Sequence, residues 1–134
     1  RVSREEAELQ ALAEEKLKLV GLASKMYYPA EILPYGEQRL LEIARAMASE
    51  PKLILLDEPC AGLNEGETRK LAKLIRSLPD MGISVLIVEH DMEMVMSIAD
   101  RVVVLNYGSK LSEGTPEVIQ NDSRVISAYL GEEV

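Results

Sequence analysis

The stretch Leu53–Pro59, which reads Leu-Ile-Leu-Leu-Asp-Glu-Pro, constrains the fold of this chain most strongly. Four consecutive apolar residues predict a short strand that is buried on both faces. The strand runs directly into two adjacent carboxylates, Asp57 and Glu58, and charged groups are costly to place at the end of a buried element. A metal ion, a water molecule to be activated or a solvated loop would offset that cost. The pattern alone leaves a catalytic site and a simple polar turn open as alternatives.

Length and composition narrow the class of protein. A chain of 134 residues suits one domain, and an apolar content of 47% is ample for a core, which argues against disorder. The net charge of −8 argues against a nucleic-acid-binding surface, which is normally basic. A single cysteine, Cys60, excludes an internal disulfide framework and fits a reducing compartment. No apolar run approaches the roughly 18 residues of a membrane span.

Hydrophobic periodicity and punctuating residues give the order of the elements. The capping box at Ser3–Glu6 opens a first helix that Gly21 is well placed to end, and Thr115-Pro116 opens a later one. Other helices are expected near residues 37–49, 65–77, 92–99 and 123–130, strands near 53–56 and 83–88, and a β-hairpin from 102–105 and 110–113. Strands that alternate with helices predict an α/β fold.

Three further segments surround the apolar strand. They are Leu33–Met47, the tetrapeptide Ala61–Asn64, and Val85–Asp91, which holds the only histidine. In this order and at this spacing, the four elements resemble the signature motif, Walker B strand, D-loop and switch histidine of the nucleotide-binding subunit of ABC transporters. The Tyr-Gly in the signature, the Ala-Gly-Leu-Asn and a tail containing Glu-Gly-Thr-Pro-Glu and Ala-Tyr-Leu-Gly-Glu resemble the branched-chain amino-acid uptake family in particular.

This resemblance implies a fold and a division of the chain. The fold would be the C-terminal part of a P-loop NTPase-type (RecA-like) ABC ATPase domain, with part of its helical subdomain. Residues 1–50 would be the helical portion that ends in the signature helix, residues 51–114 the RecA-like core portion, and residues 115–134 a C-terminal helical tail. No G-x-x-x-x-G-K-[ST] phosphate-binding loop occurs in the sequence. The family carries that loop nearer its N-terminus, so we expect this chain to correspond to roughly the second half of the subunit.

The resemblance also assigns roles to the residues that follow the strands. Asp57 would hold Mg²⁺, directly or through water, and Glu58 would orient or deprotonate the attacking water. His90 would contact the γ-phosphate of ATP. Asn64 stands where many members have an aspartate in the D-loop. Without the resemblance, Glu58 would be interpreted as a solvated loop acid and His90 as a structural histidine.

The signature segment would bind the ATP held by the opposite subunit. The free N–H groups and the dipole at the start of a helix favour phosphate there. Pro34 stands where a serine is usual, and Tyr35 replaces the first glycine, so two donors are lost. The hydroxyl of Tyr35 is one possible replacement. The residues expected at this contact are Pro34, Tyr35, Gly36, Glu37 and Gln38.

By resemblance, the parent protein is an ATPase subunit that powers uptake of branched-chain or related amino acids and uses ATP and Mg²⁺. Its partners would be a second nucleotide-binding subunit, transmembrane permease subunits and, indirectly, a periplasmic or extracellular solute-binding protein, with no nucleic acid. It would lie in the prokaryotic cytoplasm, on the inner face of the membrane. This chain alone, which has no phosphate-binding loop, is expected to be inactive. The alternatives are a non-transport ABC-type ATPase acting on DNA or ribosomes, and a fragment that serves only in folding or interaction.

Overall fold

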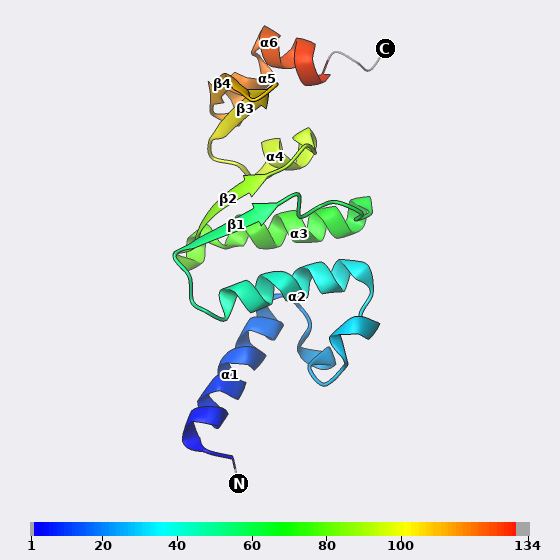
Figure 1. Cartoon of the computed structure of the whole chain (residues 1–134), viewed down its shortest axis with the longest axis vertical. Helices are drawn as coiled ribbons and strands as arrows, with labels where there is room; N and C mark the ends of the chain where they lie inside the picture. The colour runs from blue at the N-terminus through cyan, green and yellow to red at the C-terminus, as the bar shows by residue number, and fades with distance from the viewer. Residues whose placement is uncertain (1, 131–134) are drawn as a thin grey trace. The chain divides into compact units, whose positions relative to one another are not determined.

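The computed structural model describes residues 2–130, and the chain forms two compact units, Arg1–Val88 and Glu89–Val134. The end of the predicted tail, residues 131–134, lies outside the described residues. The first unit contains α1 (Arg4–Leu19), η1 (Ala23–Lys25), η2 (Ala30–Ile32), α2 (Tyr35–Met47), β1 (Leu53–Asp57), α3 (Glu65–Ser77), η3 (Pro79–Met81) and β2 (Ser84–Val88) (Figure 1). The second contains α4 (Met92–Ile98), β3 (Val102–Asn106), β4 (Ser109–Gly114), α5 (Pro116–Gln120), α6 (Ser123–Val125) and the π-helical turn η4 (Ile126–Leu130). The subdomain limits expected at 50/51 and 114/115 stay a prediction.

The sheet of the first unit is a parallel pair. Leu53 of β1 lies opposite Ser84 of β2, and the register continues to the last residues of both strands. A parallel pair needs a crossover connection, and α3 supplies it, running alongside the two strands in Figure 1. Ile54 is buried, and it lines one groove together with residues of α2 and α3.

The opposite face of this sheet is open, so the expectation of a strand buried on both faces is wrong in the structure. Leu55 is 67% exposed and Leu86, its partner in the register, is 59% exposed. Side chains alternate along a strand, and α2 and α3 lie on the face that carries Ile54. The residues that share the open face are Leu53, Leu55, Asp57, Ser84, Leu86 and Val88.

Helix α2 begins two residues earlier than its sequence predicts. The N–H of Gln38 donates to the carbonyl of Pro34 at 3.0 Å, which closes the first turn on Tyr35 rather than near Glu37. Proline is tolerated at this position because a helix leaves its first N–H groups unpaired in any case. In its second half, α2 buries Ala44 in a cluster with Val20 and Leu22.

Helix α1 has the predicted capping box at Ser3 and Glu6, but it packs only at its C-terminal end. Val20, just past the helix, is buried, whereas Leu9 is 59% exposed and Ala13 is exposed too. Of the apolar residues on the stripe predicted along α1, Leu17 and Val20 are therefore covered, whereas Leu9 and Ala13 are not. Helix α1 contacts α2 and η1.

The second unit is built on the predicted hairpin. Tyr107 and Gly108 connect β3 to β4 and have φ of 48° and 77°. Two central residues with positive φ are what a type I′ turn requires, and this turn matches the twist of paired strands. The hairpin packs against the three short helices, and the buried cluster consists of Val95, Val102, Val104, Ile119 and Val125.

Asp122 links the hairpin to the last helical turns. Its carboxylate accepts a hydrogen bond from the Ser112 hydroxyl at 2.7 Å and others from the guanidinium and backbone N–H of Arg124. The Arg124 side chain, then Ser112, then the Arg124 backbone hold the pKa of Asp122 well below its ordinary value. Ser112 is buried in β4, so this cluster ties the start of α6 to the sheet.

We predict that Asp122→Asn weakens this link in a pH-dependent way. Because the folded-state pKa lies below the unfolded value of about 3.9, the carboxylate stabilises the fold above that pH and loses its effect as pH falls through the folded pKa. Amide hydrogen exchange of β3 and β4 should be slower in the wild type than in the variant at pH 7, and this gap should narrow below about pH 4. Asp80→Asn, at an exposed residue of η3, is the control. A gap of equal size at both pH values would contradict the prediction.

Candidate functional site

Asp57, predicted to hold Mg²⁺, and Glu58, predicted to act on the attacking water, lie at the carboxyl end of the parallel pair. Asp57 is the last residue of β1 and Glu58 follows it, and both are exposed. The N–H of Glu58 donates to the carbonyl of Val88, the last residue of β2, at 2.7 Å. Glu58 has a φ of 43°, which is uncommon for a residue with a side chain and persists where neighbouring contacts fix the backbone. The backbone of Glu58 is therefore held at the end of the sheet while its side chain reaches solvent.

The turn after Glu58 leads into α3. The N–H of Ala61 donates to the carbonyl of Glu58 at 3.1 Å, and Gly62 has a φ of 77°. Asn64 is the N-cap of α3: its Oδ1 accepts from the N–H of Glu67 at 2.8 Å, and its Nδ2 donates to Glu67 Oε1 at 2.5 Å. The side chain of Asn64 is thus engaged within the unit, and its expected contact across a dimer stays a prediction.

The polar side chains of the signature segment also bind inside the first unit. Glu37 pairs with Lys25 of η1, with 2.6 Å between Nζ and Oε1, and Gln38 Nε2 donates to the carbonyl of Leu33 at 3.0 Å. Pro34 gives α2 no side-chain cap. What the start of α2 offers to an anion is therefore its backbone N–H groups and its dipole.

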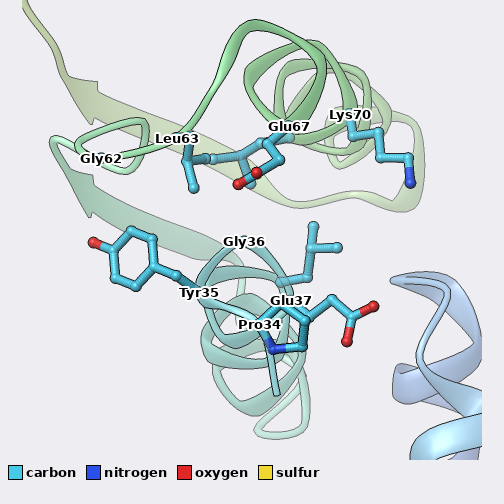
Figure 2. Close-up of a pocket in the computed structure, with 10 residues that line it drawn as sticks. Pro34, Tyr35, Gly36, Glu37, Gly62, Leu63, Glu67 and Lys70 are labelled. Carbon is cyan, nitrogen blue, oxygen red and sulfur yellow. The ribbon is translucent and has the colours of Figure 1, made fainter. Parts of the chain in front are cut away.

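Tyr35 points toward the turn that follows Glu58 (Figure 2). Its hydroxyl donates to the carbonyl of Ala61 at 3.2 Å and accepts from Nη2 of Arg39 at 2.6 Å. A Cβ added to Gly62 would lie 3.0 Å from Cε1 of the Tyr35 ring. The sequence analysis considered this hydroxyl as a replacement donor to phosphate, whereas in the structure it donates to a backbone carbonyl of the turn.

A second close approach, between Gly36 and Glu67, did not follow from the sequence reasoning. A Cβ on Gly36 would collide with the carboxylate of Glu67, which in Figure 2 extends from α3 toward the start of α2. The spacing Asn64-x-x-Glu67 is a capping signature, and it was the signal that could have singled out Glu67. A pocket of about 310 Å³ separates the two helix starts, and it is lined by Pro34, Tyr35, Gly36, Glu37, Leu40, Gly62, Leu63, Glu67, Lys70 and Leu71.

Asp57 fits one mode of Mg²⁺ binding. Among residues 2–130, no group of three or more acids, histidines or cysteines is placed to hold a metal ion. Mg²⁺ commonly keeps several waters and binds one or two carboxylates together with the phosphates of a substrate. An exposed carboxylate at the end of a strand suits that mode, and Asp57 is the residue that would supply it.

His90 belongs to the second unit. Its side chain is 74% exposed, while the side chain of Glu89 beside it is only 1% exposed. Glu89 Oε1 accepts the backbone N–H of His90 at 3.0 Å and lies 3.5 Å from its Nδ1. Asp91 follows as the N-cap of α4. The buried carboxylate and the cap fix the backbone on both sides of His90, and the imidazole reaches solvent.

Comparison with known proteins shows the family of the chain. A family model described as ABC transporter matches residues 2–61, and one described as branched-chain amino acid ATP-binding cassette transporter matches residues 109–134. The crystal structure of an ATP-binding cassette of an ABC transporter in its ADP conformation superposes with a TM-score of 0.84 at 30% identity, covering 93% of this chain and 51% of that chain. The chain therefore belongs to the ATP-binding cassette family of ABC transporters.

Within that family, the chain is similar to ATP-binding proteins of branched-chain amino acid transport. It is 48% identical to the high-affinity branched-chain amino acid transport ATP-binding protein BraF of Pseudomonas aeruginosa over 130 residues, which is 96% of this chain and 51% of BraF. It is 49% identical to the corresponding LivG protein of Escherichia coli over 117 residues, or 87% of this chain and 46% of LivG. The chain thus spans about half the length of the curated relatives that it matches. In the part of the chain that is described, no helix is both long enough and apolar enough to cross a bilayer.

Replacing Gly62 of the turn or Gly66 of α3 with alanine should change the free energy of unfolding in opposite directions. At Gly62, alanine would be held at positive φ with its Cβ 3.0 Å from the Tyr35 ring, and we expect a loss of about 1–2 kcal/mol in the free energy of unfolding. At Gly66, within α3, the Cβ would make an ordinary 3.5 Å contact with Asn64, and we expect a gain of about 0.5 kcal/mol from helix propensity. Urea unfolding followed by circular dichroism measures both values. A neutral Gly62→Ala would show that the turn relaxes freely.

Proposed function

We propose that this chain is part of an ATP-hydrolysing subunit that powers uptake of branched-chain or related amino acids through an ABC transporter. The observation that carries the proposal is the placement of Glu58, an exposed carboxylate whose backbone is tied to the end of the parallel pair by the 2.7 Å hydrogen bond to Val88. The amino-acid class is supported by the names of the relatives BraF and LivG.

In this proposal, Glu58 orients the attacking water and accepts its proton. A general base must be held within hydrogen-bonding reach of the proton that it takes, and the fixed backbone of Glu58 serves that need. Asp57, one residue earlier, would hold Mg²⁺, which supplies charge stabilisation to the phosphate oxygens when bound. His90 would contact the γ-phosphate through its exposed imidazole.

The start of α2 would bind the phosphate of an ATP held by a second nucleotide-binding subunit. Its polar side chains are engaged within the unit, so this contact would rest on backbone N–H groups from Tyr35 onward. A composite site of this kind requires a dimer of ATP-binding subunits. Permease subunits would receive the motion at the inner face of the membrane, and a solute-binding protein would deliver the amino acid to them. The net charge of −8 argues against the alternative of an ATPase that acts on DNA or ribosomes.

In an ATP-binding subunit that contains these 134 residues together with a phosphate-binding loop, Glu58→Gln should lower the ATPase rate by about 10²–10⁴-fold, because it removes the base and keeps the shape. ATP affinity should remain. Glu50→Gln is a matched control, since Glu50 is also an exposed glutamate, with a φ of 51°. Steady-state phosphate release measures the rate. Undiminished turnover in Glu58→Gln would assign the base to another residue.

His90→Ala should slow hydrolysis without a comparable loss of nucleotide affinity.

The 134-residue chain by itself should bind Mg-ATP only weakly, because its sequence holds no glycine-rich loop with a lysine to cradle the phosphates. Isothermal titration calorimetry with Mg-ATP measures this directly, and the longer subunit provides the positive control. A dissociation constant near 1 μM, or about −8 kcal/mol, would reveal a nucleotide site outside the arrangement proposed here.

A further inference from the structure

A line of backbone and side-chain hydrogen bonds runs through the candidate site. The Tyr35 hydroxyl donates to the carbonyl of Ala61 at 3.2 Å, the N–H of Ala61 donates to the carbonyl of Glu58 at 3.1 Å, and the N–H of Glu58 donates to the carbonyl of Val88 at 2.7 Å. The residue proposed as the base is thus held from two sides. Strand β2 fixes it on one side, and the first residue of α2 fixes the turn on the other.

Glu58 needs such support. Its φ of 43° lies in the left-handed region, which is sterically unfavourable for a residue that has a side chain. A residue keeps such a conformation only where its surroundings hold it there. If the turn were released at Ala61, the backbone of Glu58 could relax toward negative φ, and its carboxylate would move.

Arg39 fixes the direction in which the Tyr35 hydroxyl points its proton. Nη2 of Arg39 lies 2.6 Å from that oxygen, and a guanidinium only donates. The single proton of the hydroxyl is therefore directed to Ala61. Arg39 is itself held by Glu42 at 3.1 Å, and its guanidinium carbon lies 5.1 Å from the centre of the Tyr35 ring, within range of a cation–π contact.

The ring of Tyr35 also matches the turn in shape. Gly62 leaves just enough room for it, since a Cβ there would come within 3.0 Å of the ring. Tyr35→Phe keeps this ring contact and removes both hydrogen bonds of the hydroxyl. The substitution therefore tests the hydrogen bond to Ala61 separately from the packing of the ring against Gly62.

We infer that Tyr35 is a positioning residue of the hydrolysis reaction: through Ala61 it holds the turn after Glu58 and keeps the base in place, and its hydroxyl does not bind phosphate. The inference rests on the proposed function for the role of Glu58. Steady-state kinetics distinguish a hydroxyl that binds phosphate from a hydroxyl that positions the base. Loss of a phosphate ligand would raise KM for ATP, whereas loss of a tether that positions the base lowers kcat and leaves KM unchanged.

The first test uses the ATP-binding subunit that contains this chain, assayed for phosphate release over a range of Mg-ATP concentrations. Tyr35→Phe should lower kcat by roughly 3–10-fold with KM unchanged, because of its two lost hydrogen bonds the one to Ala61 holds the turn, and an ordinary hydrogen bond has an effect of this size. Tyr27→Phe is the matched control, because Tyr27 is 82% exposed and lies outside the site. A raised KM with unchanged kcat would place the hydroxyl on the nucleotide and overturn the inference, as would kinetics identical to those of the wild type.

The second test uses amide hydrogen exchange on the 134-residue chain. The N–H of Ala61, which bonds to Glu58, should exchange roughly 3–10-fold faster in Tyr35→Phe than in the wild type. The amide of Leu71, in the middle of α3, should be unchanged in the same sample. Equal protection of the Ala61 N–H in both proteins would contradict the inference that Tyr35 holds the turn. If the wild-type subunit has no ATPase activity, the proposed function fails, and the exchange of Ala61 still decides whether Tyr35 holds the turn.

Discussion

The hydrogen bond from the N–H of Glu58 to the carbonyl of Val88 is the interaction on which the candidate site depends. At 2.7 Å, it carries the pairing of β1 and β2 one residue beyond the strands, at a residue whose φ is already positive. The chain is thereby turned out of the sheet at a fixed point. Everything that follows, the turn at Ala61 and Gly62 and the start of α3, takes its position from that residue. A polar side chain placed here has a defined location without being buried.

Elements with local signals were predictable from the sequence. Helix α3 has the bounds expected, Glu65–Ser77, because Asn64 caps it and Pro79 follows its last turn. The hairpin forms where Tyr107-Gly108 supplies two residues with positive φ. The exposure of Leu55 was not predictable in this way. A run of apolar residues signals that a strand has apolar neighbours, but which of its faces is covered depends on segments that lie far away in the sequence.

Motif order was enough to name the candidate site residues, but it did not indicate which groups they contact in the structure. The pair Lys25–Glu37 joins residues 12 positions apart, and Tyr35 reaches Ala61 across 26 positions. Neither contact leaves a periodic trace in the sequence. The early start of α2 belongs with the contact between Tyr35 and Ala61, because it makes Tyr35 the first residue of the helix. These contacts are tertiary, and only the folded geometry defines them.

The contacts in the structure give a physical reason for Pro34 and Tyr35, the two residues at which the signature segment differs from the usual motif. Pro34 supplies no side-chain cap, and Tyr35, Glu37 and Gln38 all direct their polar groups to protein partners. Phosphate binding at this helix start would therefore depend on backbone N–H groups, whose directions are set by the helix itself. The side chains serve to hold that helix against η1, against the connector before Pro34 and against the turn after Glu58. In the proposed phosphate contact, the rigidity gained in this way would stand in place of the hydroxyl donor that the usual serine contributes, because a preorganised set of N–H groups loses little entropy when it binds an anion.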